Sequence, residues 1–389
     1  MVPTIRKLVV AVGSGVITFD SLPDFETKSI YEITVEVSDG TNSVSQELTI
    51  DVTNIGDIWV QRGDDIDGEA VFDQSGYSVS LSADSDTVAI GAPFNDDSGT
   101  NAGHVRIYDW FDAVWTQRGE DINGEATRPW SGYSVSLSED GDTVAIGAPA
   151  NTGSNAGHVR IYDWDGSSWT QRGDDIDGEA AGDSSGSSVS LSEDGNTVAI
   201  GATGNDDGGT KAGHVRIFDW DGSVWTQRGD DIDGEGPDDW SGSPLSLSED
   251  GNTIAIGARF NDGWTSQTGH VRIFDWDGSA WTQRGADIDG EAAGDTSGNA
   301  ISLSEDGNTV AIGASGNQDG GDDAGHVRIY DWSDDAWAQR GDDIDGEAVF
   351  DRSGSSVSLS EDGNTVAIGA SHNRDGGRDA GHVRIYDWQ

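Results

Sequence analysis

The sequence predicts an all-β protein made largely of six copies of one four-stranded unit. Three observations support this: a repeat of fixed period, strand-like apolar runs separated by Gly-, Asp- and Asn-rich turns, and the lack of any stretch with helical periodicity. A period of this size is typical of an array of equivalent modules. Because a β-propeller buries faces that no single four-stranded sheet could bury, we predict a six-bladed β-propeller.

The tryptophan that opens the motif Trp-x-Gln-Arg-Gly marks the period. It recurs at intervals of 54 or 56 residues, at Trp59, Trp115, Trp169, Trp225, Trp281 and Trp337. The two-residue difference lies in one segment, residues 149–156. We therefore expect this segment to be a surface loop, because such connections tolerate changes in length.

Each unit reads as four strands in order, as residues 186–229 illustrate. A run of small residues leads to an Asp194-Gly195 hairpin turn, and Thr-Val-Ala-Ile-Gly-Ala follows it. After a ten-residue loop come Gly-His-Val-Arg-Ile-Phe-Asp-Trp and then Trp-Thr-Gln-Arg-Gly. The small residues suit inner strands near a central axis, and the aromatic residues suit the wider spaces between blades.

The two ends of the array predict how the ring closes. It begins on a fourth strand, residues 59–63, and ends on a third strand, residues 382–388. We expect residues 59–63 to pair with the last sheet and to complete a ring of six blades. An incomplete seven-bladed ring is the alternative.

The first fifty-odd residues have a different pattern. Residues 31–37 and 44–52 alternate apolar and polar side chains on either side of a turn, which predicts a hairpin, and residues 15–19 predict one more strand. We therefore divide the chain into a partial β segment at 1–53, a linker at 54–58 and the propeller at 59–389. A segment this small buries too little apolar area to be stable alone.

The charge restricts the classes of partner. The chain has 72 acidic and 21 basic residues and a formal net charge of −51. Such a balance argues against nucleic acids and anionic membrane surfaces. Since self-repulsion destabilises a compact acidic protein, it favours bound divalent cations or a saline setting, with a merely solvated acidic surface as the alternative. No apolar run is long enough to span a membrane, and the chain has no cysteine.

A recurring acidic loop between the units is the candidate metal site. Asp65, Asp67, Glu69 and Asp73 stand at loop positions one, three, five and nine, a spacing like that of a calcium loop. The same positions recur at Asp175, Asp177, Glu179 and Asp183; Asp231, Asp233, Glu235 and Asp239; Asp287, Asp289, Glu291 and Asp295; and Asp343, Asp345, Glu347 and Asp351. The copy at Asp121 has Asn123 and Pro129 in two of these places and should bind weakly. The alternative is that these acids shape turns.

Other recurring polar residues are expected to have structural roles. The loop after the second strand carries an asparagine in every unit, from Asn95 to Asn373, and we expect it to form turns. Six of the seven histidines stand in Gly-His-Val-Arg-Ile, once per unit, and we expect them to pack. Four Arg-Gly-Asp tripeptides coincide with the end of a repeated strand and are expected to be accidental.

Aromatic residues that depart from the repeat are the candidate ligand-binding residues. They lie in the loops, at Phe94, Trp130, Trp240, Phe260 and Trp264. Because the repeat cannot account for them and exposed aromatic residues favour binding surfaces, we expect them to contact a glycan or a protein.

Both parts of the chain resemble known families. Residues 59–389 resemble FG-GAP repeats, the units of the integrin α-chain propeller, through Ser75-Gly76, Gly91-Ala92-Pro93 and Gly103 and their equivalents. Residues 15–53 resemble the C-terminal half of a cadherin-like domain through Leu22-Pro23-Asp24-Phe25-Glu26 and Val37-Ser38-Asp39-Gly40. The second resemblance implies that Asp24, Glu26 and Asp39 would bind calcium between successive domains.

Together these observations predict an extracellular or cell-surface, calcium-supported adhesion or recognition module. We expect it to bind protein or glycan through its loops, to be a monomeric propeller within a larger multidomain chain, and to lack enzymatic activity, because a near-perfect sixfold repeat offers few residues in unequal roles. The alternatives are a polysaccharide-degrading enzyme that uses two carboxylates and a purely structural spacer.

Overall fold

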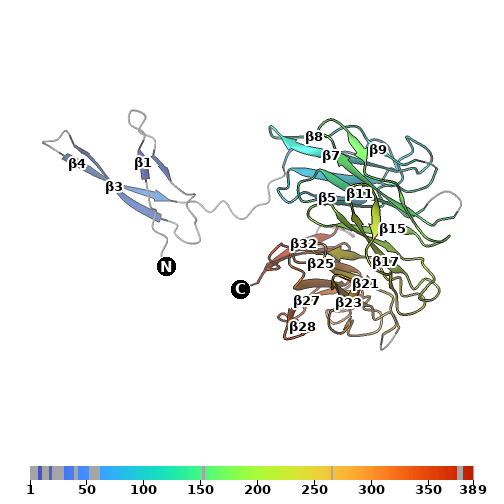
Figure 1. The fold of residues 1–389 in the computed structure, drawn as a ribbon. Helices are drawn as coiled ribbons and strands as arrows, with labels where there is room; N and C mark the ends of the chain where they lie inside the picture. The colour runs from blue at the N-terminus through green and yellow to red at the C-terminus, as the bar shows by residue number, and fades with distance from the viewer. Residues whose placement is uncertain are drawn as a thin grey trace. The chain divides into compact units, whose positions relative to one another are not determined.

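The structure, a computed structural model, describes strands at residues 8–10, 17–19, 30–38 and 43–51, and then residues 62–388 except 126, 151–153, 264–265 and 375–379. Every regular element in this part of the chain is a β-strand (Figure 1). The chain divides into two compact units, Met1–Arg62 and Gly63–Gln389. The all-β prediction is therefore confirmed.

The first unit contains two antiparallel strand pairs. Strand β1 (Leu8–Val10) pairs with β2 (Ile17–Phe19), and β3 (Ile30–Ser38) pairs with β4 (Ser43–Asp51). The predicted hairpin is confirmed, with Ile33 opposite Leu48. Several predicted features lie outside the described residues: Asp24, Glu26, Asp39, the linker at 54–58 and Trp59.

The second unit contains six antiparallel sheets in chain order, which confirms the six-bladed β-propeller. Five sheets have four main strands: β5 (Ser78–Leu81), β6 (Thr87–Ala92), β7 (His104–Phe111) and β8 (Val114–Gln117); β10 (Ser134–Leu137), β11 (Thr143–Ala148), β12 (His158–Trp164) and β13 (Trp169–Gln171); β15 (Ser185–Leu191), β16 (Thr197–Ala202), β17 (His214–Trp220) and β18 (Trp225–Gln227); β20 (Leu245–Leu247), β21 (Thr253–Ala258), β22 (His270–Trp276) and β23 (Trp281–Gln283); β25 (Ala300–Leu303), β26 (Thr309–Ala314), β27 (His326–Ser333) and β28 (Ala336–Gln339). The sixth sheet has three described strands: β30 (Ser353–Leu359), β31 (Thr365–Ala370) and β32 (His382–Asp387).

A two-residue strand follows each fourth strand and pairs with the start of the third strand of the same blade. These short strands are β9 (Ile122–Asn123), β14 (Ile176–Asp177), β19 (Ile232–Asp233), β24 (Ile288–Asp289) and β29 (Ile344–Asp345). The repeat pattern did not predict them. They bring the loop that leaves a blade back to the histidine that opens its third strand, as in the pairing of His214 with Asp233.

The second strand of each blade is the centre of the core. In the first five blades all six of its residues are buried. In β16, Val198 and Ile200 pack with residues of the second blade, whereas Ala199 packs with residues of the fourth. Alternate side chains of one strand therefore face the two neighbouring blades, and both faces of the sheet are covered.

Neighbouring blades approach closely at glycine residues. A Cβ atom on Gly147 would clash with the carbonyl oxygen of Gly186 in the next blade, and the same clash recurs between Gly201 and Gly242. The hydroxyl of Ser134 donates a hydrogen bond of 2.9 Å to Gly186 O. Only residues without bulky side chains allow this approach, so the prediction of small residues on the inner strands is confirmed.

At the outer edge, a tryptophan connects each blade to the preceding one. Trp225 Nε1 donates a hydrogen bond of 2.8 Å to Arg172 O, and the Arg172 guanidinium lies over the rings of Trp220 and Trp225 at 5.1 and 5.4 Å. The indole also packs against the core between the second and third blades. Equivalent hydrogen bonds are made by Trp169, Trp281 and Trp337.

At the axis, backbone hydrogen bonds connect the hairpins that follow the first strands. The amides of Ala83, Glu139, Glu193, Glu249 and Glu305 each donate to the carbonyl of the equivalent residue in the next blade, over 2.9 to 3.2 Å. The last acceptor is Glu361. Five bonds thus join six blades in sequence around a common axis.

The sixth blade retains exposed apolar side chains. On β32, Val383 is 65 % exposed, and the ring of Trp388 borders a cavity of about 190 Å³ with Arg340 and Gly341. In the other blades the equivalent glycine lies under two tryptophan rings, whereas Gly341 lies near Trp388 alone. The predicted closing strand at 59–63 lies outside the described residues except for its last two, so this closure stays a prediction.

Replacement of Trp225 by alanine tests the connection between blades. We expect Trp225→Ala to lower the free energy of unfolding by about 3 kcal/mol, because it removes a large packed side chain and its hydrogen bond. Denaturant unfolding of the full chain measures this. The exposed neighbour Thr226 is the control, and a Thr226→Ala loss as large as that of Trp225→Ala would contradict the assignment.

Candidate functional site

The acidic loops do not form the single-loop sites that the sequence suggested. The position-nine acid is buried: Asp239 accepts hydrogen bonds from the Gly236 amide at 2.8 Å and from Asn261 Nδ2 at 3.0 Å. The same arrangement holds at Asp73 with Asn95 and at Asp351 with Asn373. In these three loops the position-nine aspartate and the loop asparagine are thus partners in a buried turn.

The residues at positions one and three contact the blade that the loop leaves. Asp231, at position one, accepts a hydrogen bond of 2.6 Å from Gln227 of β18. Asp233, at position three, pairs through its backbone with β17, and its carbonyl accepts a hydrogen bond of 2.6 Å from Arg272 of the following blade. The acids of one loop are therefore divided between two blades.

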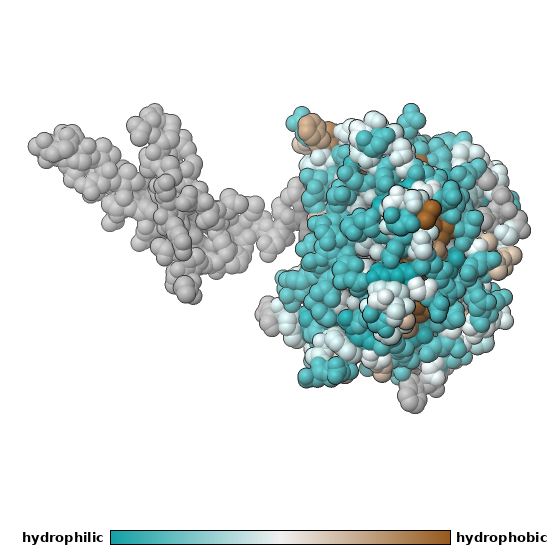
Figure 2. All heavy atoms as spheres, viewed as in Figure 1, coloured by the Kyte–Doolittle hydropathy of each residue, from teal (hydrophilic) through white to brown (hydrophobic). Residues whose placement is uncertain are grey.

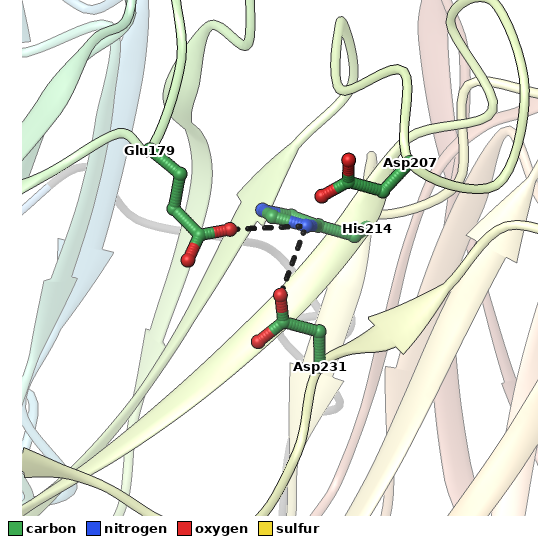
Figure 3. A group of neighbouring side chains, drawn as sticks. All are labelled: Glu179, Asp207, His214 and Asp231. Carbon is green, nitrogen blue, oxygen red and sulfur yellow. Dashed lines mark ion pairs between the residues drawn. The ribbon is translucent and has the colours of Figure 1, made fainter.

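The acids at positions one and five meet a histidine that the repeat pattern had assigned to packing. In the third blade, Glu179 precedes β15, Asp207 lies between β16 and β17, His214 opens β17 and Asp231 follows β18. One ligand atom from each of these four residues lies within 4.8 Å of the others. Figure 3 shows the three carboxylates around one edge of the imidazole. We call this group the third-blade cluster.

Equivalent clusters occur in other blades. A four-residue cluster in the fifth blade consists of Glu291, Asp319, His326 and Asp343. Three-residue clusters occur in the first and fourth blades, at Glu69, His104 and Asp121 and at Glu235, His270 and Asp287. Asp121 belongs to the loop that was predicted to bind weakly, and it takes part through its position-one acid.

The sequence contains a signal that could have identified the histidines. In each of these four blades the histidine follows the position-five glutamate by 35 residues and precedes the next position-one aspartate by 17. This relation spans two successive loops, so the pattern of a single loop does not contain it. Only the short strands such as β19, which return the chain to the histidine, show that two different loops supply the acids.

Burial controls the ionisation of the third-blade cluster. His214 is fully buried, and burial lowers the pKa of its imidazole below the ordinary value. Burial also raises the pKa of Glu179, which the Arg216 guanidinium opposes from 3.7 Å. Asp231 Oδ2 is 3.6 Å from His214 Nδ1, which is too far for a normal hydrogen bond.

The described clusters combine acids from two loops with a histidine, and the predicted calcium set of a single loop differs from them. Calcium takes six to eight oxygen ligands, whereas the described clusters place a buried imidazole nitrogen among the carboxylates and leave out the acids at positions three and nine. The calcium set predicted from one loop is therefore not assembled around one point in the described residues.

The aromatic residues predicted to bind a ligand gather in the loops at one end of the blades. Trp130 lies 5.6 Å from Phe94 and 6.3 Å from Tyr133 between ring centroids, and Tyr77 is 4.9 Å from Tyr133. All four rings are at least partly exposed. The Trp130 backbone amide donates to Asn101 O, so the loop before the second blade packs on the loop of the first.

A second group continues this surface. Trp240 lies 5.0 Å from Phe260, and the Arg259 guanidinium and the Lys211 ammonium lie over the Trp240 ring at 5.8 and 5.7 Å. Burial and the neighbouring Tyr133 raise the pKa of Tyr77, and the charge of Arg259 acts in the opposite direction. Trp264 lies outside the described residues. We call the surface formed by both groups the aromatic face: Tyr77, Phe94, Trp130, Tyr133, Lys211, Trp240, Arg259 and Phe260.

A ring of glutamates surrounds the axis at the opposite end of the first strands. Glu139, Glu193, Glu249, Glu305 and Glu361 border one cavity of about 270 Å³. A hydrogen bond with Glu305, together with partial burial and the neighbouring carboxylates, raises the pKa of Glu249 to about 8. Figure 2 shows that hydrophilic residues also dominate the visible face of the propeller.

Comparison with known proteins supports the fold. A model of the FG-GAP repeat matches residues 66–108 and 176–218, in the first and third blades. No curated protein matches the chain in sequence. No match supports the resemblance of residues 15–53 to a cadherin-like domain, which stays a prediction.

Two solved structures are similar in fold. Hydrazine synthase of Kuenenia stuttgartiensis has a TM-score of 0.50 and 13 % identity, over 80 % of this chain and 82 % of that one. A proposed 6-phosphogluconolactonase of Bacteroides uniformis has a TM-score of 0.54 and 14 % identity, over 80 % of both chains. At such identities the similarity shows the propeller fold alone.

The raised pKa of Glu249 predicts a pH-dependent stability. The folded protein holds this proton up to about pH 8, whereas the unfolded chain releases it near pH 4.5, so its contribution is present below pH 4.5 and is lost as pH rises towards 8. We therefore expect Glu249→Gln to raise the melting temperature at pH 8 and to have little effect at pH 4. Thermal unfolding across this range measures it. The exposed Glu120→Gln removes the same charge elsewhere, and an equal gain there would contradict the prediction.

Proposed function

We propose that the propeller is a non-enzymatic recognition module, located outside the cell or at its surface, that binds a protein or glycan through the aromatic face. The observation that carries this proposal is the position of the side chains that depart from the repeat. Phe94, Trp130, Trp240 and Phe260 come from three blades and still lie at the same end of the propeller, beside one another in two groups. Tryptophan, tyrosine and arginine are the residue types enriched at binding sites.

The basic residues that depart from the repeat support an acidic ligand. Within residues 63–388 each of the first five blades repeats two arginines and the sixth has one. The described basic residues that depart from this pattern are Arg128, Lys211, Arg259, Arg352 and Arg374. All five are in loops at the end that carries the aromatic face. In a chain of net charge −51, placing these cations beside aromatic rings favours a ligand with carboxylate or sulfate groups.

The absence of enzymatic activity is part of the proposal. Catalysis needs a small set of residues in unequal roles. The described clusters of acids and histidine instead recur in four blades with similar geometry, which supports a shared structural or cation-binding role. A polysaccharide-degrading activity would need two carboxylates that differ from all their repeats.

An extracellular setting and a role in adhesion complete the proposal. The FG-GAP matches support it, because such repeats are typical of extracellular proteins. Among the described residues, no helix is long and apolar enough to cross a membrane. Calcium support stays a prediction for the loop acids, and dialysis against ⁴⁵Ca²⁺ measures it.

Substitution on the aromatic face tests the recognition function. The full chain is applied to arrays of neutral and acidic glycans and of extracellular proteins. We expect Trp240→Ala and Arg259→Ala each to weaken retention about tenfold or more, as loss of an anchor residue costs at least about 1.4 kcal/mol. Retention of an acidic ligand should also fall as salt is raised.

The control is Phe111→Ala, because Phe111 is 76 % exposed at the opposite end of its strand. Equal loss in this variant would remove the aromatic face from the proposal. Retention that survives both aromatic-face substitutions would place binding on another surface. No retention of the unchanged chain on any array would favour a structural spacer. Turnover of chromogenic sugars would favour the enzyme.

A further inference from the structure

We propose that the third and fifth blades each bind one divalent transition-metal ion, of the class of Zn²⁺, through a histidine Nδ1 and three carboxylates. This inference is independent of the recognition function. It rests on a buried imidazole that lacks a hydrogen-bond partner and on the acids that surround it. The sites would be formed by Glu179, Asp207, His214 and Asp231 and by Glu291, Asp319, His326 and Asp343.

The histidines of the third and fifth blades are buried without hydrogen-bond partners. His214 and His326 are both 0 % exposed, and neither ring nitrogen of either residue has a hydrogen-bond partner among the described residues. A buried polar group without a partner is costly, and a native structure rarely keeps one without a reason. A bound cation on Nδ1 would satisfy this atom, whereas the surrounding carboxylates are too distant to do so directly.

The ligand atoms of the third-blade cluster lie close to one another. In the third blade, Nδ1 lies 3.6 Å from Asp231 Oδ2 and 4.0 Å from Glu179 Oε2, and all four ligand atoms lie within 4.8 Å of one another. Four ligands around zinc, at about 2.1 Å each, stand about 3.4 Å apart in a tetrahedron. Small rotations of exposed carboxylates would close the difference. Figure 3 shows that the side chains already converge.

The charge of the third-blade cluster suits a divalent cation. Three carboxylates and one neutral imidazole carry −3, and the Arg216 guanidinium near Glu179 reduces this to −2. A divalent cation would neutralise the remainder.

The donor atoms favour zinc and its neighbours over calcium and magnesium. Imidazole nitrogen suits zinc and its neighbours, whereas calcium and magnesium prefer oxygen throughout. The ligands are also held by hydrogen bonds of their own: Gln227 Nε2 donates to Asp231 Oδ1 at 2.6 Å, and the Asp207 amide donates to Asn205 Oδ1 at 2.9 Å. Such support around the ligands is characteristic of metal sites.

The repeat provides an internal comparison. The fourth blade has Glu235, His270 and Asp287, but Gly263 stands where the third blade has Asp207. This site therefore has one carboxylate fewer. The first blade has Asp97 at this place, but Asp97 lies outside the cluster of Glu69, His104 and Asp121. We therefore expect the third and fifth blades to bind metal more tightly than the first and fourth, which predicts two tight sites per chain.

The effect of such a cation would be to connect neighbouring segments. The third-blade ligands come from the loop before the blade, the loop between β16 and β17, the start of β17 and the loop after β18. One ion would hold these four segments together at the end of the propeller that carries the aromatic face.

Metal titration of the full chain tests this proposal. The protein is stripped with EDTA, and Zn²⁺ binding is measured by calorimetry and by the visible spectrum of Co²⁺. We expect two tight sites per chain and a higher melting temperature with zinc. The double variant Asp207→Asn/Asp319→Asn should lower the affinity of both sites about 10- to 100-fold, and because both residues are exposed, it should still fold.

The control double variant is Asp230→Asn/Asp342→Asn. It removes the same charge from exposed aspartates directly next to the ligands Asp231 and Asp343, and it should keep both tight sites. Equal weakening in the two double variants would indicate non-specific attraction to an acidic surface and would overturn the proposal. So would the absence of tight zinc binding, or calcium binding with equal affinity that Asp207→Asn/Asp319→Asn leaves unchanged.

Discussion

The close approach of neighbouring sheets is the constraint on which the rest of this structure depends. Where Gly147 meets Gly186, one sheet lies so near the next that no side chain fits between them. This contact places Val198 and Ile200 against one neighbour and Ala199 against the other, so each second strand is buried on both faces. Because the contact recurs from blade to blade, it also sets the position of every loop at the two ends of the propeller.

The two candidate sites use this framework in different ways. The histidine clusters depend on the repeat, because each needs the same three segments in the same positions. The aromatic face depends on departures from it, since Trp130 and Trp240 replace small or polar residues at equivalent places in the other blades. The proposed cation sites thus belong to the regular part of the scaffold, and the proposed recognition surface belongs to its least regular loops.

The sequence alone was enough to predict the repeat, the strand order and the hairpin between β3 and β4, since period and alternation are local properties. It also located the unusual aromatic residues. It was not enough to pair His214 with Glu179 and Asp231, because these residues belong to different loops and meet only when β19 pairs with β17. The buried role of Asp239 was likewise hidden, since its partner Asn261 is 22 residues away.

The chain of backbone hydrogen bonds at the axis has a consequence for how this fold could change. Each bond from Ala83 to Glu361 spans about the same 2.9 to 3.2 Å, so the circumference of the hub is set by the peptide group and not by side chains. Ala83 makes this bond as the glutamates of the other blades do, because only backbone groups take part. The side chains around the axis could therefore change without loss of the links between blades.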